Sequence, residues 1–414
     1  MSDTRNVFVL ILSVMIVQIA GGLLSMLTPL GLEAMGSGPQ TIGVIAGFNA
    51  AGYMIGAWSA PRMLGQFGNI RLFAAASAMN AVAVLALSLW HDAAFWALLR
   101  IVQGIAFAYM FTSIESWMGE AVPDKSRGNV MGIYHTGAKL SLMIGPFFVA
   151  GMSPLDGRAY AWAGLFLALA LVPVCLTRQK EPAPPDRKSM PVAELFRIAP
   201  AAVIGVLLAG VINTGTLALL PVYFERFELA GGGTAAVAIA GAAAWLGGLI
   251  LQWPAGVLSD RVERRLVIAG MCIMSGIASL LIAVFGVALG EIGVIAVLTI
   301  WGAGALSFYG LCVAHAIDRT PRGRVPQVMS GLLFVWAAGS IAGPLMSGFA
   351  MRVADRAGLF GLSGVLLLVL AVLMVIRVRQ RAGPTEAQQE EWKPVTPTSL
   401  AGVELDPRNP DVES

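Results

Sequence analysis

Ionisable side chains inside long apolar runs are the residues of this chain best placed to do chemistry. Arg100 and Glu115 lie in one such run, and His135 and Lys139 lie in the next run along the chain. Charge is costly in apolar surroundings, so each of these groups needs a partner, water or a functional cavity. A carboxylate or an imidazole placed in this way can carry protons, and a fixed Arg or Lys charge can bind an anion.

The residues around Arg100 share one helical face. Spacings of three and four residues align Arg100, Gln103, Phe107, Phe111 and Glu115. A lipid-facing arginine is disfavoured by its cost, which predicts that this stripe faces an internal cavity. Arg100 is then expected to bind substrate, with a structural tether to backbone carbonyls as the alternative. Gln103 and Phe107 are expected to line the substrate site.

Lys139 lies near the middle of its apolar run, and His135 precedes it by one helical turn on the same face. Three roles are open for Lys139: an anion ligand, a proton-linked switch, or a partner of Glu115. His135 can titrate near physiological pH or can be a satisfied structural residue. Glu115 can carry protons or can form a gate salt bridge with the basic loop that follows it.

The second half of the chain offers amide and aromatic side chains in place of deep charges. The further candidates for substrate contact are Asn49, Tyr53, Asn213, Trp245, Gln252, Trp301 and Phe308. An aromatic wall opposite a basic wall suits an amphipathic organic molecule. Each aromatic residue taken singly can equally well be a packing residue.

Composition places these residues in a membrane protein. Hydrophobic residues make up 57% of the chain and charged residues 12%, whereas a soluble domain carries about 25% charged residues. A membrane helix needs about 20 apolar residues. Twelve such runs are predicted, at 7–30, 41–62, 71–90, 93–119, 129–151, 159–176, 198–224, 234–257, 266–287, 292–315, 327–351 and 358–376.

Loop charge predicts the orientation of these spans. Most Lys and Arg residues outside the spans follow the even-numbered ones, which places both termini in the cytoplasm. The first span is too long and too weakly flanked for a cleaved signal peptide. We expect an N-terminal six-helix half at 1–176, a cytoplasmic linker at 177–197, a C-terminal six-helix half at 198–376 and a disordered cytoplasmic tail at 377–414.

The two halves of the sequence echo each other. Pro123 and Gly145-Pro146 in the first half recur, at one constant offset, as Pro321 and Gly343-Pro344 in the second half. An ordered set of matches indicates an internal repeat, and six spans per unit make the two halves parallel repeats. The three cysteines lie within spans and lack metal-ligand spacing, so no metal or other cofactor is expected.

A charged loop between two apolar runs connects these halves to a known family. Residues 256–265 read GVLSDRVERR. This stretch resembles the signature loop of the major facilitator superfamily, Gly-x-Leu-x-Asp-Arg-x-Gly-Arg-Arg, with Glu263 in place of the second glycine. The first-half counterpart has Gly65 and Gln66 where Asp and Arg are expected. The resemblance implies that the loop helps to latch the cytoplasmic side shut, with Asp260 as a conformational residue rather than a substrate ligand.

Further motifs extend the resemblance over all twelve spans. Residues 100–104, RIVQG, are similar to an Arg-x-x-Gln-Gly motif linked with proton coupling in this superfamily. Gly132, Gly137 and Gly145-Pro146 resemble the antiporter motif of drug exporters, without its trailing glycine pair. Glu115-Ser-Trp117 and His315-Ala-Ile-Asp318 resemble signatures of a poorly characterised bacterial branch of the superfamily.

The resemblance implies an all-α polytopic membrane protein with the major facilitator fold, twelve transmembrane helices in two six-helix halves. Spans one, four, seven and ten then surround a central cavity, and alternating access moves one half against the other. The residues expected to gate this movement are Asp260, Arg261, Arg264, Arg265, Gly145, Pro146, Gly343, Pro344, His315 and Asp318. Glu115, His135, Lys139 and Arg100 are the expected proton-coupling groups.

Two transport functions remain open. The first is proton-coupled export of small amphipathic organic molecules, and the second is proton-coupled uptake of a small organic anion. An enzyme is not expected, since a nucleophile–base pair, a metal site and a phosphate loop are all missing from the sequence, and a receptor or scaffold role would need a soluble domain. The expected partners are a small-molecule substrate, protons and the lipid bilayer of the inner membrane, without nucleic acid. A monomer is expected from the resemblance.

Overall fold

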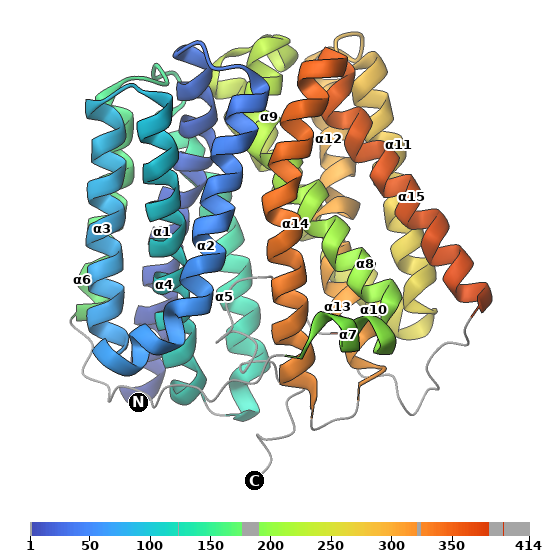
Figure 1. Cartoon of the computed structure of the whole chain (residues 1–414), viewed down its shortest axis with the longest axis horizontal. Coiled ribbons are helices and arrows are strands. Elements are labelled where there is room, and N and C mark those ends of the chain that lie inside the picture. The colour runs from blue at the N-terminus through green and yellow to red at the C-terminus, as the bar shows by residue number, and fades with distance from the viewer. Residues whose placement is uncertain (1, 123, 176–189, 321–323, 381–391, 393–414) are drawn as a thin grey trace. The chain divides into compact units, whose positions relative to one another are not determined.

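The structure is a computed structural model that describes residues 2–122, 124–175, 190–320, 324–380 and 392. Within these residues the regular secondary structure is helical, and no strand occurs. Ten stretches of the described residues are long and apolar enough to cross a membrane. The last of them, Gln327–Gln380, contains two helices, and α5 adds one more helix. The described residues thus hold the twelve predicted membrane spans, and Figure 1 shows how their helices are arranged within each unit.

Each predicted apolar run coincides with a helix or with a pair of helices in series. These are α1 (Ser2–Ala34), α2 (Pro39–Phe67), α3 (Asn69–Leu89), α4 (Ala93–Ala121), α5 (Asp124–Ile144), α6 (Gly157–Cys175), α8 (Pro200–Ala209) with α9 (Gly215–Arg226), α10 (Gly233–Arg261), α11 (Arg264–Phe285), α12 (Gly290–Ala305) with α13 (Phe308–Ile317), α14 (Val325–Ala354) and α15 (Gly358–Gln380).

The described residues form two compact units. One holds α1, α3 to α6 and the larger part of α2, and the other holds residues 37–47 and the helices from α7 onward. In the first unit α3 packs between α4 and α6, and α1 packs against α5 and α6. In the second unit α11 packs against α12 and α15, and α14 packs along α8 and α9.

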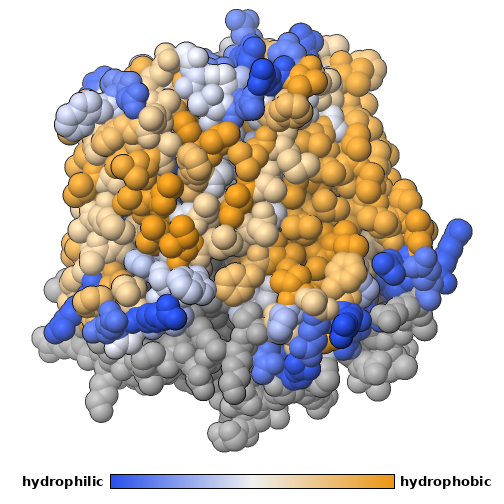
Figure 2. Space-filling view, viewed as in Figure 1, coloured by the Kyte–Doolittle hydropathy of each residue, from blue (hydrophilic) through white to orange (hydrophobic). Residues whose placement is uncertain are grey.

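The outer surface of the helices is apolar. Phe8, Val82, Trp253 and Ile292 are among the large hydrophobic side chains exposed along them. Figure 2 shows such residues along the sides of the helices, with hydrophilic residues gathered towards the helix ends. In water such an exposed apolar surface would promote aggregation, whereas in a bilayer it is the surface expected to contact lipid.

Three spans depart from regular α-helix, and one of them contains the break between α12 and α13. Between α8 and α9 the residues Gly210–Thr214 form a π-helical segment, a local bulge that often lies at functional sites. After α5 the residues Gly145–Val149 form a 3-10 helix with Pro146 near its start. Proline lacks the N–H that would continue the α-helical hydrogen bonds, so α5 ends there.

Glycines at helix crossings let backbones approach closely. A Cβ at Gly145 would collide with the Ile19 carbonyl of α1, and a Cβ at Gly343 of α14 would collide with the Val211 carbonyl. Small residues permit such close contacts between membrane helices. The repeated Gly-Pro pairs thus mark a helix crossing in each unit.

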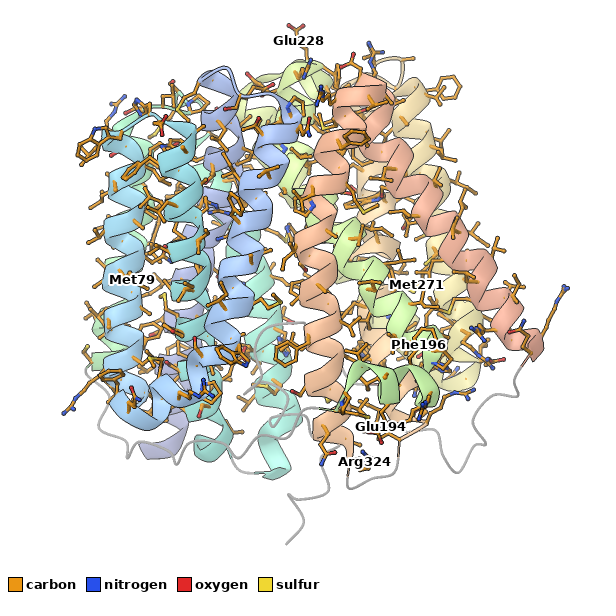
Figure 3. The ribbon with its side chains drawn as sticks, viewed as in Figure 1. Met79, Glu194, Phe196, Glu228, Met271 and Arg324 are labelled. Carbon is orange, nitrogen blue, oxygen red and sulfur yellow. The ribbon has the colours of Figure 1, made fainter. Side chains whose placement is uncertain are left out.

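The second unit contains, before α8, a short helix that sequence reasoning missed. Part of the expected linker forms α7 (Val192–Ile198), and Glu194 of α7 pairs with Arg324 at 2.8 Å (Figure 3). The Met190 N–H also donates to the Gln327 carbonyl of α14 at 3.2 Å. Residues 176–189, and the expected disordered tail apart from Trp392 and the end of α15, lie outside the described residues.

Candidate functional site

Helix α4 carries a polar pair, Arg100 and Gln103, on one face. Asp92 caps the start of this helix by accepting a hydrogen bond of 2.8 Å from the Phe95 N–H. Two turns further on, Arg100 Nη1 donates to Gln103 Oε1 at 2.9 Å, and Asn49 Nδ2 of α2 donates to the Arg100 carbonyl at 3.1 Å. The structure thus brings together three residues that the sequence analysis named as separate candidates, Arg100, Gln103 and Asn49.

This pair keeps unused hydrogen-bonding capacity. Gln103 is fully buried. Arg100 Nε and Gln103 Nε2 are buried donors without a hydrogen-bond partner in the part of the chain that the structure describes. An unsatisfied buried donor is costly, and a ligand that accepts from it relieves that cost. The arrangement suits an acceptor group on a bound molecule.

An aromatic wall continues the same face of α4. The rings of Phe107 and Phe111 stack with their centroids 6.4 Å apart and an interplanar angle of 20°. Phe111 is buried and Phe107 half-buried. The face therefore offers donors at one end and flat apolar surface in its middle.

A buried acid lies at the other end of this face. Glu115 is fully buried, and the phenol of Tyr134 donates to its Oε1 at 2.6 Å. Tyr53 of α2 lies within electrostatic range of both groups. Tyr134 was missed by sequence reasoning, although a tyrosine directly before His135, in the run that holds Lys139, is a polar signal in its own right.

Helix α5 carries the other two candidate groups, His135 and Lys139. The ring of His135 contacts the ring of Tyr134 edge-on, with centroids 5.1 Å apart, and is half-buried. Lys139 is buried, with 8% of its surface exposed. The gate salt bridge considered for Glu115 stays an open alternative, because the side chains of Lys125 and Arg127 lie outside the described residues.

The candidates in the second unit divide into two groups. Asn213 lies in the π-helical segment, and its Oδ1 is buried without a hydrogen-bond partner among the described residues. Trp245 and Gln252 of α10 are half-buried. Trp301 and Phe308, by contrast, have no exposed surface, and Trp301 Nε1 donates to Ser363 Oγ of α15 at 3.1 Å. That contact favours the packing interpretation of Trp301.

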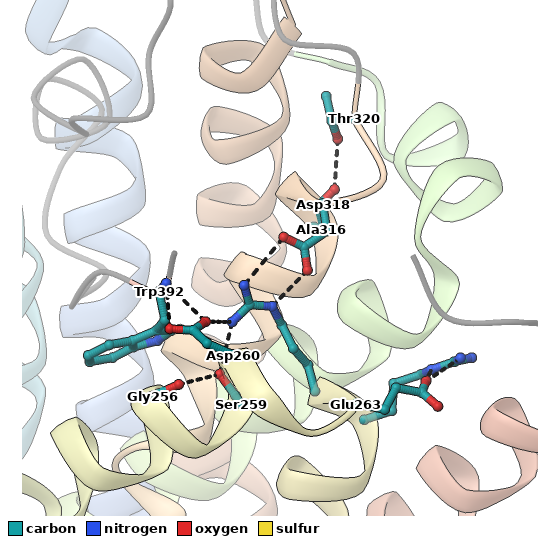
Figure 4. Close-up of polar contacts among 10 residues, drawn as sticks. Gly256, Ser259, Asp260, Glu263, Ala316, Asp318, Thr320 and Trp392 are labelled. Carbon is teal, nitrogen blue, oxygen red and sulfur yellow. Dashed lines mark hydrogen bonds and ion pairs between the residues drawn. The ribbon is translucent and has the colours of Figure 1, made fainter. Parts of the chain in front are cut away.

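The signature loop forms a charged network at the end of α10 (Figure 4). Arg264 donates to Asp318 at 2.7 Å, to Ser259 at 2.8 Å and to Asp260 at 3.0 Å. The side chains of Arg264 and Asp318 are almost entirely buried. A buried pair needs such additional hydrogen bonds to offset its desolvation. The network ties α10 and α11 to the end of α13.

The remaining loop residues extend this network. Arg265 pairs with Glu263 and donates from Nη1 to the Arg377 carbonyl of α15 at 2.6 Å. His315 is buried within electrostatic range of Arg264 and Arg265, and Arg261 is exposed. All these contacts lie inside the second unit. Sequence reasoning selected Asp260, Arg264, Arg265, His315 and Asp318, and it missed Ser259 and Glu263.

Comparisons with known proteins agree with this architecture. The family model described as Major Facilitator Superfamily matches residues 10–312 and 232–407. An uncharacterized MFS-type transporter of Yersinia pseudotuberculosis is 25% identical over 90% of this chain and 96% of its own length. The uncharacterized MFS-type transporter YcaD of Salmonella enteritidis is 22% identical over 84% of this chain and 90% of its own length.

Solved transporter structures share the fold. A bacterial homologue of the human lysosomal transporter Spinster matches with a TM-score of 0.74 and 15% identity, over 93% of this chain and 99% of that chain. The nucleoside transporter NupG matches with a TM-score of 0.71 and 12% identity, over 90% of this chain and 99% of that chain. These relatives and neighbours are transporters and not enzymes. The chain belongs to the Major Facilitator Superfamily.

Proposed function

We propose that this secondary transporter is a proton-coupled exporter of small amphipathic organic molecules. The observation that carries the proposal is the hydrogen bond between Tyr134 and the fully buried Glu115. When Glu115 is ionised, the phenol donates to it, and when Glu115 is protonated, its O–H can donate to the phenol oxygen. Both protonation states thus keep a hydrogen bond, as a group that takes up and releases protons in each cycle requires.

The face of α4 that carries Arg100 and Gln103 supports an amphipathic substrate. The donors of Arg100 and Gln103 can bind its polar end, and the stacked rings of Phe107 and Phe111 offer an apolar surface for the rest. Arg100 and Glu115 are fifteen residues apart, or about 22 Å along the helix. Substrate and proton sites therefore belong to one rigid element, which would couple them through movement of that element.

Export is favoured by the resemblance of α5 to the antiporter motif. The glycines of that motif differ in their surroundings: Gly145 packs closely on α1, Gly137 lies against Met15, and Gly132 has open space around it. The proposal includes an inner-membrane location with both termini in the cytoplasm, a monomer, and a division into six-helix halves at 1–176 and 198–376.

Proton-coupled uptake of a small organic anion is the second candidate. Its support is the pair of buried donors without hydrogen-bond partners among the described residues, Arg100 Nε and Gln103 Nε2, together with the buried cation of Lys139. Fixed donors and cations bind a carboxylate well. The exporter is preferred because the rings of Phe107 and Phe111 separate the donors near Arg100 from the carboxyl group of Glu115. This separation suits a longer molecule with a polar end and an apolar body.

Transport in proteoliposomes tests the proposal. A thermal-shift screen of drugs, amino acids, sugars and organic acids first supplies a ligand, since binding to the folded state raises the melting temperature. We expect uphill transport of that ligand under a pH gradient, and we expect an uncoupler to abolish it. The Glu115→Gln variant should also lose uphill transport, but it should still exchange the ligand across the membrane at equilibrium. Uphill transport that withstands the uncoupler, or full coupling in Glu115→Gln, contradicts the proposal.

A further inference from the structure

The end of α10 holds a residue from far along the chain. The backbone N–H of Trp392 donates to both carboxylate oxygens of Asp260, at 3.0 Å to Oδ1 and 3.1 Å to Oδ2 (Figure 4). Trp392 lies 132 residues after Asp260 and keeps only 6% of its surface exposed. A hydrogen bond to a charged acceptor is stronger than one between neutral groups.

The indole of Trp392 lies against a glycine one helical turn before Asp260. A Cβ added at Gly256 would collide with Cε3, Cδ2 and Cζ3 of the ring. Residues four apart share one face of a helix. On this face Gly256 leaves the backbone bare for contact with the ring, and Asp260 offers a hydrogen-bond acceptor. Gly241 of the same helix has open space at its Cβ position, which makes the contact at Gly256 specific.

Trp392 contacts α10 through the face of its indole ring and through its main-chain N–H. Trp392 Nε1 has no hydrogen-bond partner within the described residues, so the indole contributes through its apolar surface. Asp260 also accepts from Arg264 Nη1, and Arg264 binds Asp318. The bound tryptophan is thereby joined to the buried network that holds α10, α11 and α13.

We propose that Gly256 and Asp260 form a peptide-binding site on α10, and that its occupant is Trp392 of this same chain. The site takes one backbone N–H on the carboxylate and one aromatic ring on the bare helix face. While it is occupied, the Asp260 carboxylate accepts from the Trp392 N–H on both oxygens and keeps its hydrogen bond from Arg264. The inference is independent of the substrate, the direction and the proton coupling proposed above.

Hydrogen exchange on the full-length protein gives the first test. We expect the amide of Trp392 to exchange about tenfold or more slowly in the wild type than in Asp260→Ala or Gly256→Ala, because opening must break a charge-assisted bond. Gly241→Ala is the matched control and should exchange like the wild type. Exchange at the rate of an unstructured peptide in the wild type overturns the proposal, and this comparison needs no variant to fold.

Peptide binding gives the second test. The acceptor is full-length Trp392→Ala, whose own tail lacks the indole, and the probe is a fluorescent peptide of residues 386–398. We expect saturable binding that is lost when the tryptophan of the peptide is replaced by alanine. Binding should also be lost in the double variant Gly256→Ala/Trp392→Ala and retained in Gly241→Ala/Trp392→Ala. Absent binding, or equal binding of both peptides, overturns the proposal.

Discussion

The phenol of Tyr134 donates a hydrogen bond of 2.6 Å to Oε1 of Glu115, and both side chains are buried in the first unit. Glu115 belongs to α4 and Tyr134 to α5, so the bond joins two membrane helices. A buried carboxylate without such a donor is costly. Tyr134 is therefore a positioning residue for the proposed proton site.

Tyr134→Phe should lower coupled transport by about tenfold, because a bond to a charged group contributes about 1.5–3 kcal/mol. The readout is uphill transport in proteoliposomes beside equilibrium exchange of the same ligand, which should change less. Tyr109→Phe is the matched control, since Tyr109 shares a 2.9 Å hydrogen bond with Ser59 in the same unit. Equal losses in both variants would argue for a general structural effect.

The glycines of α5 allow a test of close packing. Gly145→Ala should destabilise the protein by about 1–3 kcal/mol, because the added methyl group meets the Ile19 carbonyl of α1. Gly132→Ala should be neutral or stabilising by up to about 1 kcal/mol, since the space around Gly132 is open and alanine favours helix. Melting of the detergent-purified variants measures both effects, and equal melting temperatures would contradict the packing argument.

Helical periodicity explains how much of the fold was predictable. Twelve apolar runs give twelve spans, two of which are pairs of helices in series, and spacings of three and four place Arg100, Gln103 and Glu115 on one face. Periodicity does not give the partner of each face, because that depends on how neighbouring helices align. The Tyr134 bond to Glu115 and the burial of Trp301 against Ser363 are both contacts between helices. The Trp392 contact spans still more sequence, and no local pattern predicts it.

Asp318→Asn should destabilise the protein by about 3 kcal/mol, because removing one partner leaves the Arg264 charge buried without its closest carboxylate. The matched control is Asp355→Asn. Asp355 lies 3.8 Å from Arg226 in an exposed pair, and such pairs contribute less than about 1 kcal/mol. Thermal melting should therefore separate the two variants clearly. If both melt alike, the buried network is not the main tie between α10, α11 and α13.

Lys139→Ala decides between the two candidate substrates. Lys139 is the buried cation of α5, and an organic anion would lose its strongest attraction when this charge is removed. A cationic or neutral amphiphile would keep its contacts with Phe107 and Phe111 and would no longer meet a like charge. We therefore expect the exporter's ligands to raise the melting temperature of Lys139→Ala at least as much as that of the wild type. Stabilisation by an organic acid that disappears in this variant would instead establish anion uptake and place Lys139 in the binding site.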